Sequence, residues 1–182
     1  MIKYSKRNMH KYYVWKMRIR EGEYMKFRVI ALPPFRAASS KPDKNFDFSP
    51  TGILGKFDTY FSAIKPSDRD SFMPRDFLYF DEDKQGMIWM WALSEGMDDG
   101  GNEIIDFEGG YYLTYVYKDG DEETGGRLYE EALKYIEESE ILELDVRASH
   151  YAMGHIITPE PIIKAQGWAQ MESFIPVKLK KL

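Results

Sequence analysis

Aromatic and methionine side chains are the residues of this sequence whose types and spacing favour the binding of a small molecule. The chain holds 13 Tyr, 11 Phe, 4 Trp and 10 Met among 182 residues. Flat rings stack on planar molecules and attract cations through contacts of ~0.5–2 kcal/mol each. Many of these rings would also pack a sheet. The residues predicted to line a site for a hydrophobic, aromatic or cationic molecule are Phe57, Tyr60, Trp89, Trp91, Tyr112, Tyr115, Tyr151, Met153, His155, Met171 and Glu172.

Three ionisable residues could add charge or proton transfer to such a site. Glu172 lies inside an apolar strand pattern, where a carboxylate must find a partner, bind a cationic ligand or acquire a raised pKa. Its alternation with Gln170 and Phe174 equally allows the solvent-facing side. His155 could activate water, although a lone strand histidine is more often a hydrogen-bonded structural residue. Glu108 precedes two glycines, and a carboxylate there is commonly solvated.

The sequence lacks the motifs of common enzyme classes. It has no Gly-x-Ser-x-Gly turn, no phosphate-binding loop, no dinucleotide glycine pattern and no His-Glu-x-x-His pair. His150 and His155 lie on one predicted strand at a spacing that sends them to opposite faces, so we expect no shared metal site. The absence of cysteine excludes disulfides and thiolate chemistry. We therefore predict no catalytic residue, no metal and no cofactor, and we favour binding over catalysis.

The second half of the chain predicts a strand, a helix and two further strands, in that order. Residues 109–120 are rich in tyrosine and end at an Asp-Gly turn, which is typical of a strand. From 127 to 138, apolar residues recur every three or four positions between glutamates, which predicts an amphipathic helix. Residues 149–158 and 168–177 again have strand patterns. The two prolines between them favour a connecting loop.

The first half repeats this order with weaker signals. Residues 27–40 predict a strand that bends or lies at an edge, because it contains paired prolines. Apolar spacing over 53–64 predicts a helix, and 75–81 and 86–94 predict two more strands. The copies are offset by about 75–80 residues, which indicates a two-unit domain rather than a solenoid. The sequence therefore predicts an α+β fold built from two tandem β-α-β-β repeats.

We predict one domain over residues 27–182, preceded by a basic segment, 1–26. Repeat one spans about 27–95 and repeat two about 104–180. The net charge is −5, but residues 1–20 contain seven Lys or Arg and no acid, leaving 18 basic against 30 acidic side chains in the remainder. An acidic body disfavours binding of the domain to a phosphate backbone and permits attraction of cations.

The basic segment has two interpretations. Its Lys and Arg residues alternate with Tyr and Trp, a mixture that can neutralise phosphates and stack on bases. The alternative is a terminal element that packs its aromatics on the domain and solvates its charges. The segment is too short for the ~three-helix module of helix-turn-helix regulators, so we expect DNA as a partner only through a separate or missing domain.

Nothing in the sequence predicts a membrane segment. No run approaches the ~18 apolar residues of a membrane helix or the layout of a signal peptide. Together with the absence of cysteine, this favours a cytoplasmic protein without a membrane partner. The oligomeric state is left open by the sequence.

Two stretches of the second half resemble a known family. The tail Met-Glu-Ser-Phe-Ile-Pro-Val at 171–177 is similar to the closing strand of the GyrI-like, AraC-type effector-binding domains, which typically ends Glu-Ile-Tyr-Ile-Pro-Val. The run Gly-Gly-Tyr-Tyr at 109–112, a glycine turn and a Leu-Tyr-rich helix also resemble that multidrug-sensing, SHS2-repeat family. The likeness covers about 27–178. It implies a curved antiparallel sheet with two helices flanking a central ligand cleft.

The resemblance also implies a function and its alternatives. The family's members include drug-sensing transcription regulators, stand-alone drug binders, gyrase-inhibiting proteins and a few hydrolases. We therefore expect an effector-binding domain that binds a hydrophobic small molecule reversibly in the cleft. The alternatives are a hydrolase of reactive electrophiles, with Glu172 or His155 activating water, and a protein-interaction inhibitor of the gyrase-inhibitor type.

The sequence departs from the family at one position that bears on charge. Drug-sensing relatives have a glutamate in the strand before the last one, whereas the corresponding stretch 151–157 here has no carboxylate. This departure weakens the expectation of a strict preference for cations and of carboxylate-based hydrolysis.

Overall fold

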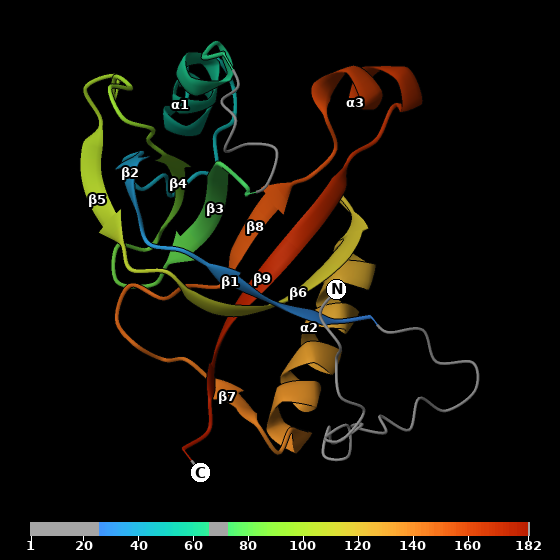
Figure 1. The fold of residues 1–182 in the computed structure, drawn as a ribbon. Helices are drawn as coiled ribbons and strands as arrows, with labels where there is room; N and C mark the ends of the chain where they lie inside the picture. Colours follow the sequence, from blue (N-terminus) through green and yellow to red (C-terminus); the bar gives the residue numbers. More distant parts are fainter. Residues whose placement is uncertain (1–25, 66–72, 182) are drawn as a thin grey trace, which may run out of the picture.

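A computed structural model describes residues 26–65 and 73–181, so the predictions for the basic segment at residues 1–25 lie outside the described residues. The fold is α+β, as predicted (Figure 1). The first half comprises β1 (Arg28–Leu32), β2 (Phe35–Ser39), α1 (Ile53–Ser62), β3 (Asp76–Asp81) and β4 (Gly86–Ala92). The second half comprises β5 (Glu103–Phe107), β6 (Gly110–Lys118), α2 (Glu122–Glu138), β7 (Leu142–Leu144), β8 (Met153–Ile156), α3 (Glu160–Gln166) and β9 (Gln170–Leu179).

The strands form one antiparallel sheet in which the two repeats are arranged in mirror order. The strand order is β1-β6-β9-β8-β3-β4-β2-β5, and β7 pairs with β9. Repeat two therefore contributes β6-β9-β8, and repeat one continues with β3-β4-β2. The repeats meet where β3 pairs with β8, through the residue pairs Leu78–Gly154 and Tyr79–Met153. The predicted duplicated layout is confirmed, with the junction at its centre.

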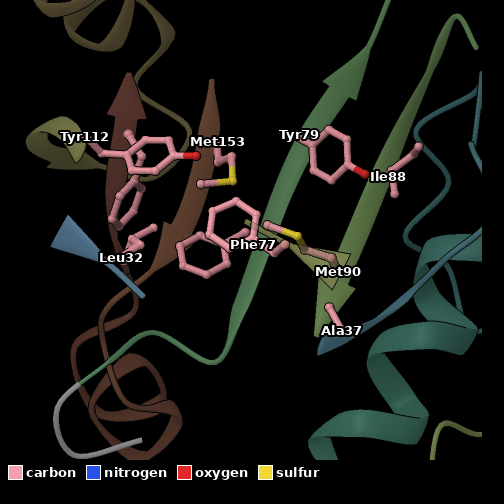
Figure 2. Close-up of a cluster of buried hydrophobic side chains, with 10 residues drawn as sticks. Leu32, Ala37, Phe77, Tyr79, Ile88, Met90, Tyr112 and Met153 are labelled. Atoms are coloured by element: carbon pink, nitrogen blue, oxygen red, sulfur yellow. The ribbon is translucent and has the colours of Figure 1, made fainter. Parts of the chain in front are cut away.

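The sheet curls around a buried core, which defines its inner face. The ring of Phe107 in β5 lies 6.3 Å from that of Tyr112 in β6, although these strands are near opposite ends of the strand order. Figure 2 shows the cluster of buried side chains on this inner face, with labelled members such as Phe77 and Tyr112 from both halves of the chain. The buried inner-face residues are Leu32, Ala37, Phe77, Tyr79, Ile88, Met90, Phe107, Tyr112, Met153 and Phe174.

Both long helices pack on the opposite, outer face. Helix α1 buries Phe57 and Phe61 against Trp91 of β4, and α2 buries Leu128 and Ile136 against strands β6 and β9. The cross-strand registers place the residues under α1 and under α2 on the same side of the sheet. Helix α1 covers β4 of repeat one, and α2 covers β6 and β9 of repeat two. The junction of β3 with β8 therefore lies between the two helices.

Helix α2 begins at Glu122, five residues before its predicted start. The side chain of Asp121 accepts a hydrogen bond of 3.0 Å from the backbone N–H of Thr124, which caps the helix. Gly125 then lets the first turn approach the sheet, since a Cβ there would lie 2.7 Å from the ring of Tyr117. Gly125 is required by this close packing, whereas a Cβ at Gly126 would meet no other atom within 4 Å.

The stretch predicted as one strand, 27–40, forms two strands. Strand β1 pairs with β6 of repeat two, whereas β2 pairs with β4 and β5. Pro33 and Pro34 separate them, because a proline has no N–H to continue a ladder. The chain thus crosses from one end of the sheet to the other at the proline pair.

Other differences from the predictions have local causes. The connection between the last two strands contains α3, because proline is tolerated in the first turn of a helix. Gly167, with φ of 78°, ends this helix in a left-handed conformation. The short strands β5 and β7 were not predicted. Strand β8 begins only at Met153, so His150 precedes it and does not lie on the predicted strand.

Candidate functional site

A cleft of about 270 Å³ lies on the outer face, over the junction of the two repeats. Its floor follows a row of paired residues that crosses the sheet, from Tyr115 through Ser173 and Gly154 to Leu78. Tyr129 of α2 forms part of one wall, and the hairpin of β3 and β4 forms another. Eight of the side chains that line it on the outer face, here called the cleft residues, are Leu78, Phe80, Met87, Tyr115, Tyr117, Tyr129, Met171 and Ser173.

The cleft exists because the centre of its floor has almost no side chain. Gly154 occupies the middle strand at the junction, where any larger residue would project outward. The thioether of Met171 lies over it, since a Cβ at Gly154 would be 3.0 Å from Sδ. Methionine is unbranched and repacks easily. Movement of this one side chain would therefore expose more of the floor.

Hydroxyl groups gather at the α2 side of the cleft. Ser173 Oγ donates a hydrogen bond of 3.4 Å to the hydroxyl oxygen of Tyr117, whose ring lies 5.9 Å from that of Tyr115. Burial raises the pKa of Tyr115 to about 12; the neighbouring Tyr117 and Tyr129 add to this shift, and the adjacent Ser173 hydroxyl opposes it. Tyr115 therefore keeps its proton near neutral pH and can act as a hydrogen-bond donor.

No charged side chain of residues 26–65 and 73–181 lines the cleft. Glu172 instead projects from β9 onto the inner face, where its side chain is only 5% exposed. Its Oε1 lies 2.6 Å from Nη2 of Arg28, and Nε of Arg28 donates to Thr114 Oγ1 at 3.0 Å. Of the alternatives left open for this carboxylate, the structure shows a partner, and it is an arginine of this chain.

The other candidate acid and base groups also lie away from the cleft. His155 faces the core beside Phe77, with ring centroids 6.2 Å apart, and is paired across strands with Glu172. Its Nδ1 is 3.2 Å from Oδ1 of Asp76, outside hydrogen-bonding geometry. The side chain of Glu108 is 69% exposed and lies 3.5 Å from Arg147. The expected water-activating residues therefore do not meet in the cleft.

The tryptophans and their neighbours pack under α1. Trp91 is 3% exposed and stacks on Phe61 at 5.2 Å. Trp89 packs against buried Phe57 at 6.1 Å, and its Nε1 donates to Oδ2 of Asp76 at 2.9 Å. These rings lie on the same face of the sheet as the cleft, but helix packing occupies them.

The remaining predicted residues divide between the two faces. Tyr112 is fully buried in the inner core, and Tyr151 stacks on Tyr79 with ring centroids 4.6 Å apart. Tyr60 is half-exposed on α1 and does not reach the cleft. Three of the predicted site residues border the cleft: Tyr115 and Met171 face it, and Met153 lines it from a strand position whose side chain packs in the inner core.

Six cleft residues were not singled out from the sequence. Strand alternation carried a signal for some of them, since Tyr117 shares a face with Tyr115, and Ser173 shares one with Met171. The contribution of Tyr129 depends on how α2 docks, which no local pattern gives. The unpredicted members are Leu78, Phe80, Met87, Tyr117, Tyr129 and Ser173.

A smaller cavity of about 120 Å³ opens on the inner side of the sheet. Tyr79, Met90 and Tyr151 contribute to its walls, and Asp81 lies at its edge. The carboxylate of Asp81 accepts hydrogen bonds of 3.0 Å from the backbone N–H groups of Asp83 and Lys84. Asp81 therefore holds the β3–β4 turn.

Within the described part of the chain, no group of three or more His, Cys, Asp or Glu side chains is placed to hold a metal ion. The helices among the same residues are all too short or too polar to span a bilayer.

Comparisons with known proteins support the fold. No family model matches the chain, and no curated protein sequence is similar to it. Among solved structures, SAV2435 bound to tetraphenylphosphonium superimposes with a TM-score of 0.53 at 12% identity, covering 85% of this chain and 94% of that one. A protein described as a candidate bacterial transcription regulator from Staphylococcus aureus gives 0.50 at 13% identity, covering 85% and 99%.

A third structure, a hydrolase from Listeria innocua, gives a TM-score of 0.49 at 14% identity and covers 84% of this chain and 92% of that one, a score that supports no inference. At these identities the likenesses establish a shared fold. The chain therefore has the fold of ligand-bound SAV2435, in agreement with the effector-binding fold that its sequence resembles.

Proposed function

We propose that this protein is a small-molecule-binding domain of the effector type and that it binds its ligand reversibly in the outer-face cleft. The observation that carries the proposal is the position of the cleft, which is apolar, rimmed by tyrosines and centred on the junction of the two repeats. A shared fold with a protein solved in complex with tetraphenylphosphonium supports it.

Apolar burial would supply most of the binding free energy. Removing apolar surface from water contributes roughly 25 cal/mol per Å², and the cleft presents aliphatic, thioether and aromatic groups. Tyr115, Tyr117 and Tyr129 add flat surfaces for stacking. Met87 and Met171 can adopt other rotamers around ligands of different shape. We therefore expect several chemically related ligands rather than one.

Paired variants of helix α2 test this proposal. Tyr129 and Tyr135 are similarly exposed, at 42% and 43%, but only Tyr129 lines the cleft. Titration calorimetry with aromatic compounds, including tetraphenylphosphonium, should show saturable binding. Tyr129→Ala should weaken it about 10-fold, the loss of roughly one ring contact, and Tyr135→Ala less than about 2-fold. Equal effects of the two variants, or no binding by any compound, would refute the proposal.

Mass analysis of the recovered compounds separates binding from turnover. Compounds returned unchanged after incubation with substoichiometric protein support reversible binding. Altered products would instead favour the hydrolase alternative, although Glu172 and His155 both face the inner core. A partner-inhibiting role would require loss of partner binding when residues 1–20 are deleted.

A further inference from the structure

We propose that the cleft selects neutral aromatic molecules that carry a hydrogen-bond-accepting oxygen, in preference to lipophilic cations. This inference rests on the proposed function and names the class of ligand for the same site. It depends on two features of the cleft: the lack of a carboxylate among its described lining residues, and the hydroxyl groups at its α2 side.

The described lining of the cleft offers no counter-charge to a cation. A buried cation loses hydration and is stabilised in a protein mainly by an opposite charge or by hydrogen bonds. Glu172, the one glutamate of β9, points to the inner face and is neutralised by Arg28 at 2.6 Å. Glu108 is exposed beside Arg147 and is not among the residues that line the cleft. A bound cation would therefore find aromatic faces in the cleft but no counter-charge from the described residues.

The cleft offers hydrogen-bond donors to a neutral ligand. Four hydroxyl groups belong to the cleft, from Tyr115, Tyr117, Tyr129 and Ser173. Each carries one proton and can donate one hydrogen bond. The proton of Ser173 is directed to the oxygen of Tyr117, which leaves the proton of Tyr117 itself available to another acceptor. A carbonyl, phosphoryl or similar oxygen on a ligand would receive this bond.

The lack of a counter-charge and the presence of hydrogen-bond donors act in the same direction. Cation–π attraction by tyrosine is real but modest at a site open to solvent. A polar oxygen that replaces water at a donor keeps its hydrogen bond, and the rest of a neutral aromatic ligand loses little on leaving water. Both effects favour a neutral ligand with an acceptor oxygen over a cation that has none.

Two phosphorus compounds test the preference directly. Tetraphenylphosphonium is a cation with no acceptor atom, and triphenylphosphine oxide is neutral with a strongly accepting oxygen. Both present phenyl rings on a tetrahedral phosphorus. Calorimetric titration should give a dissociation constant at least about 10-fold lower for the oxide. Equal or tighter binding of the cation would overturn the inference while leaving the proposed function intact.

Variants of the tyrosine hydroxyls locate the cause. Tyr117→Phe removes the donor from a half-buried position and should weaken oxide binding about 5- to 10-fold, with less than about 2-fold change for the cation. Tyr135→Phe, outside the cleft, should change neither. Unchanged oxide binding by Tyr117→Phe would also contradict the proposed donor role. Circular dichroism of each variant confirms that it is folded before titration.

A carboxylate placed in the cleft should reverse the preference. Met171→Glu puts an acidic side chain beside Gly154 at the partly exposed surface of β9, and should strengthen binding of tetraphenylphosphonium by about 10-fold or more. Met171→Gln serves as the uncharged control. Failure of both phosphorus compounds and of all other aromatic compounds to bind the unmodified protein would refute the proposed function itself, an outcome distinct from a wrong order of affinity.

Discussion

Alternate residues of strand β9 belong to two surfaces of the molecule, and these surfaces differ in the polar groups that they carry. Ser173 and Met171 face the outer cleft, whereas Glu172 and Phe174 face the inner core. On the inner side the charge is closely paired by Arg28. On the outer side the polar groups are neutral hydroxyls, and that of Tyr117 can still donate a hydrogen bond. The contrast shows that one short strand can stabilise the fold with alternate residues and offer a binding surface with the others.

The largest expected effect is on the free energy of unfolding, and it distinguishes the inner core from the outer-face cleft. Phe77 and Phe80 lie three residues apart on β3, but Phe77 is fully buried in the inner core and Phe80 is 38% exposed at the cleft. Phe77→Ala should lower the free energy of unfolding by about 3–5 kcal/mol because it leaves a cavity in close-packed surroundings. Phe80→Ala should cost less than about 1 kcal/mol. Urea denaturation measures both, and similar losses would contradict the division into core and site.

A second prediction uses the unequal burial of the ion pair on the inner face. The side chain of Arg28 is 60% exposed, whereas that of Glu172 is 5% exposed. Arg28→Met leaves a buried carboxylate without its partner and should lower the free energy of unfolding by about 2–3 kcal/mol. Glu172→Gln leaves an arginine that water can reach, and should cost only about 1 kcal/mol. Ligand affinity should stay within about 2-fold for Glu172→Gln, because the residue lies behind the cleft. A larger loss of unfolding free energy for Glu172→Gln than for Arg28→Met would show that the carboxylate stabilises the fold through more than its ion pair with the arginine.

The smallest expected effect compares two tyrosines of β6. Within the described residues, the fully buried hydroxyl of Tyr112 has no hydrogen-bond partner. Tyr112→Phe should therefore leave the free energy of unfolding unchanged or raise it by up to about 1 kcal/mol. Tyr115 lines the cleft, so Tyr115→Phe should lower ligand affinity by removing a hydrogen-bond donor. Thermal unfolding and calorimetry of the two variants would test this assignment, and a marked loss of stability in Tyr112→Phe would reveal an unrecognised partner for its hydroxyl.

The sequence predicted much of the fold because the signals involved are local. The predicted strands at 86–94 and 109–120 contain the observed β4 and β6, because aromatic-rich runs that end at turn residues are local features. The proline pair at 33–34 marked a bend, but not that the two resulting strands pair with opposite ends of the sheet. Helix α3 was missed because prolines in the first turn of a helix look like loop residues.

The site was less predictable because it depends on which parts of the outer face remain uncovered. Trp89 and Trp91 are of a residue type that often lines ligand sites, yet α1 packs over both. Tyr129 reaches the cleft only through the docking of α2 on β6. The partner of Glu172 lies 144 residues away along the chain, and no spacing rule connects the two. Three-dimensional contacts of this kind are absent from local patterns.

The pairing of β3 with β8 has the geometry of a symmetric dimer contact within a single chain. Leu78 and Gly154 both face outward, and Tyr79 and Met153 both face inward, so a two-fold axis normal to the sheet at this junction would exchange the two strands without changing their faces. Self-complementary contacts of this type join identical subunits in two-fold homodimers. The junction is what would result if two copies of one ancestral unit, first associated edge to edge, had later become joined by gene duplication. A ligand lying on such an axis would touch both copies, which accounts for a cleft that neither repeat could form alone.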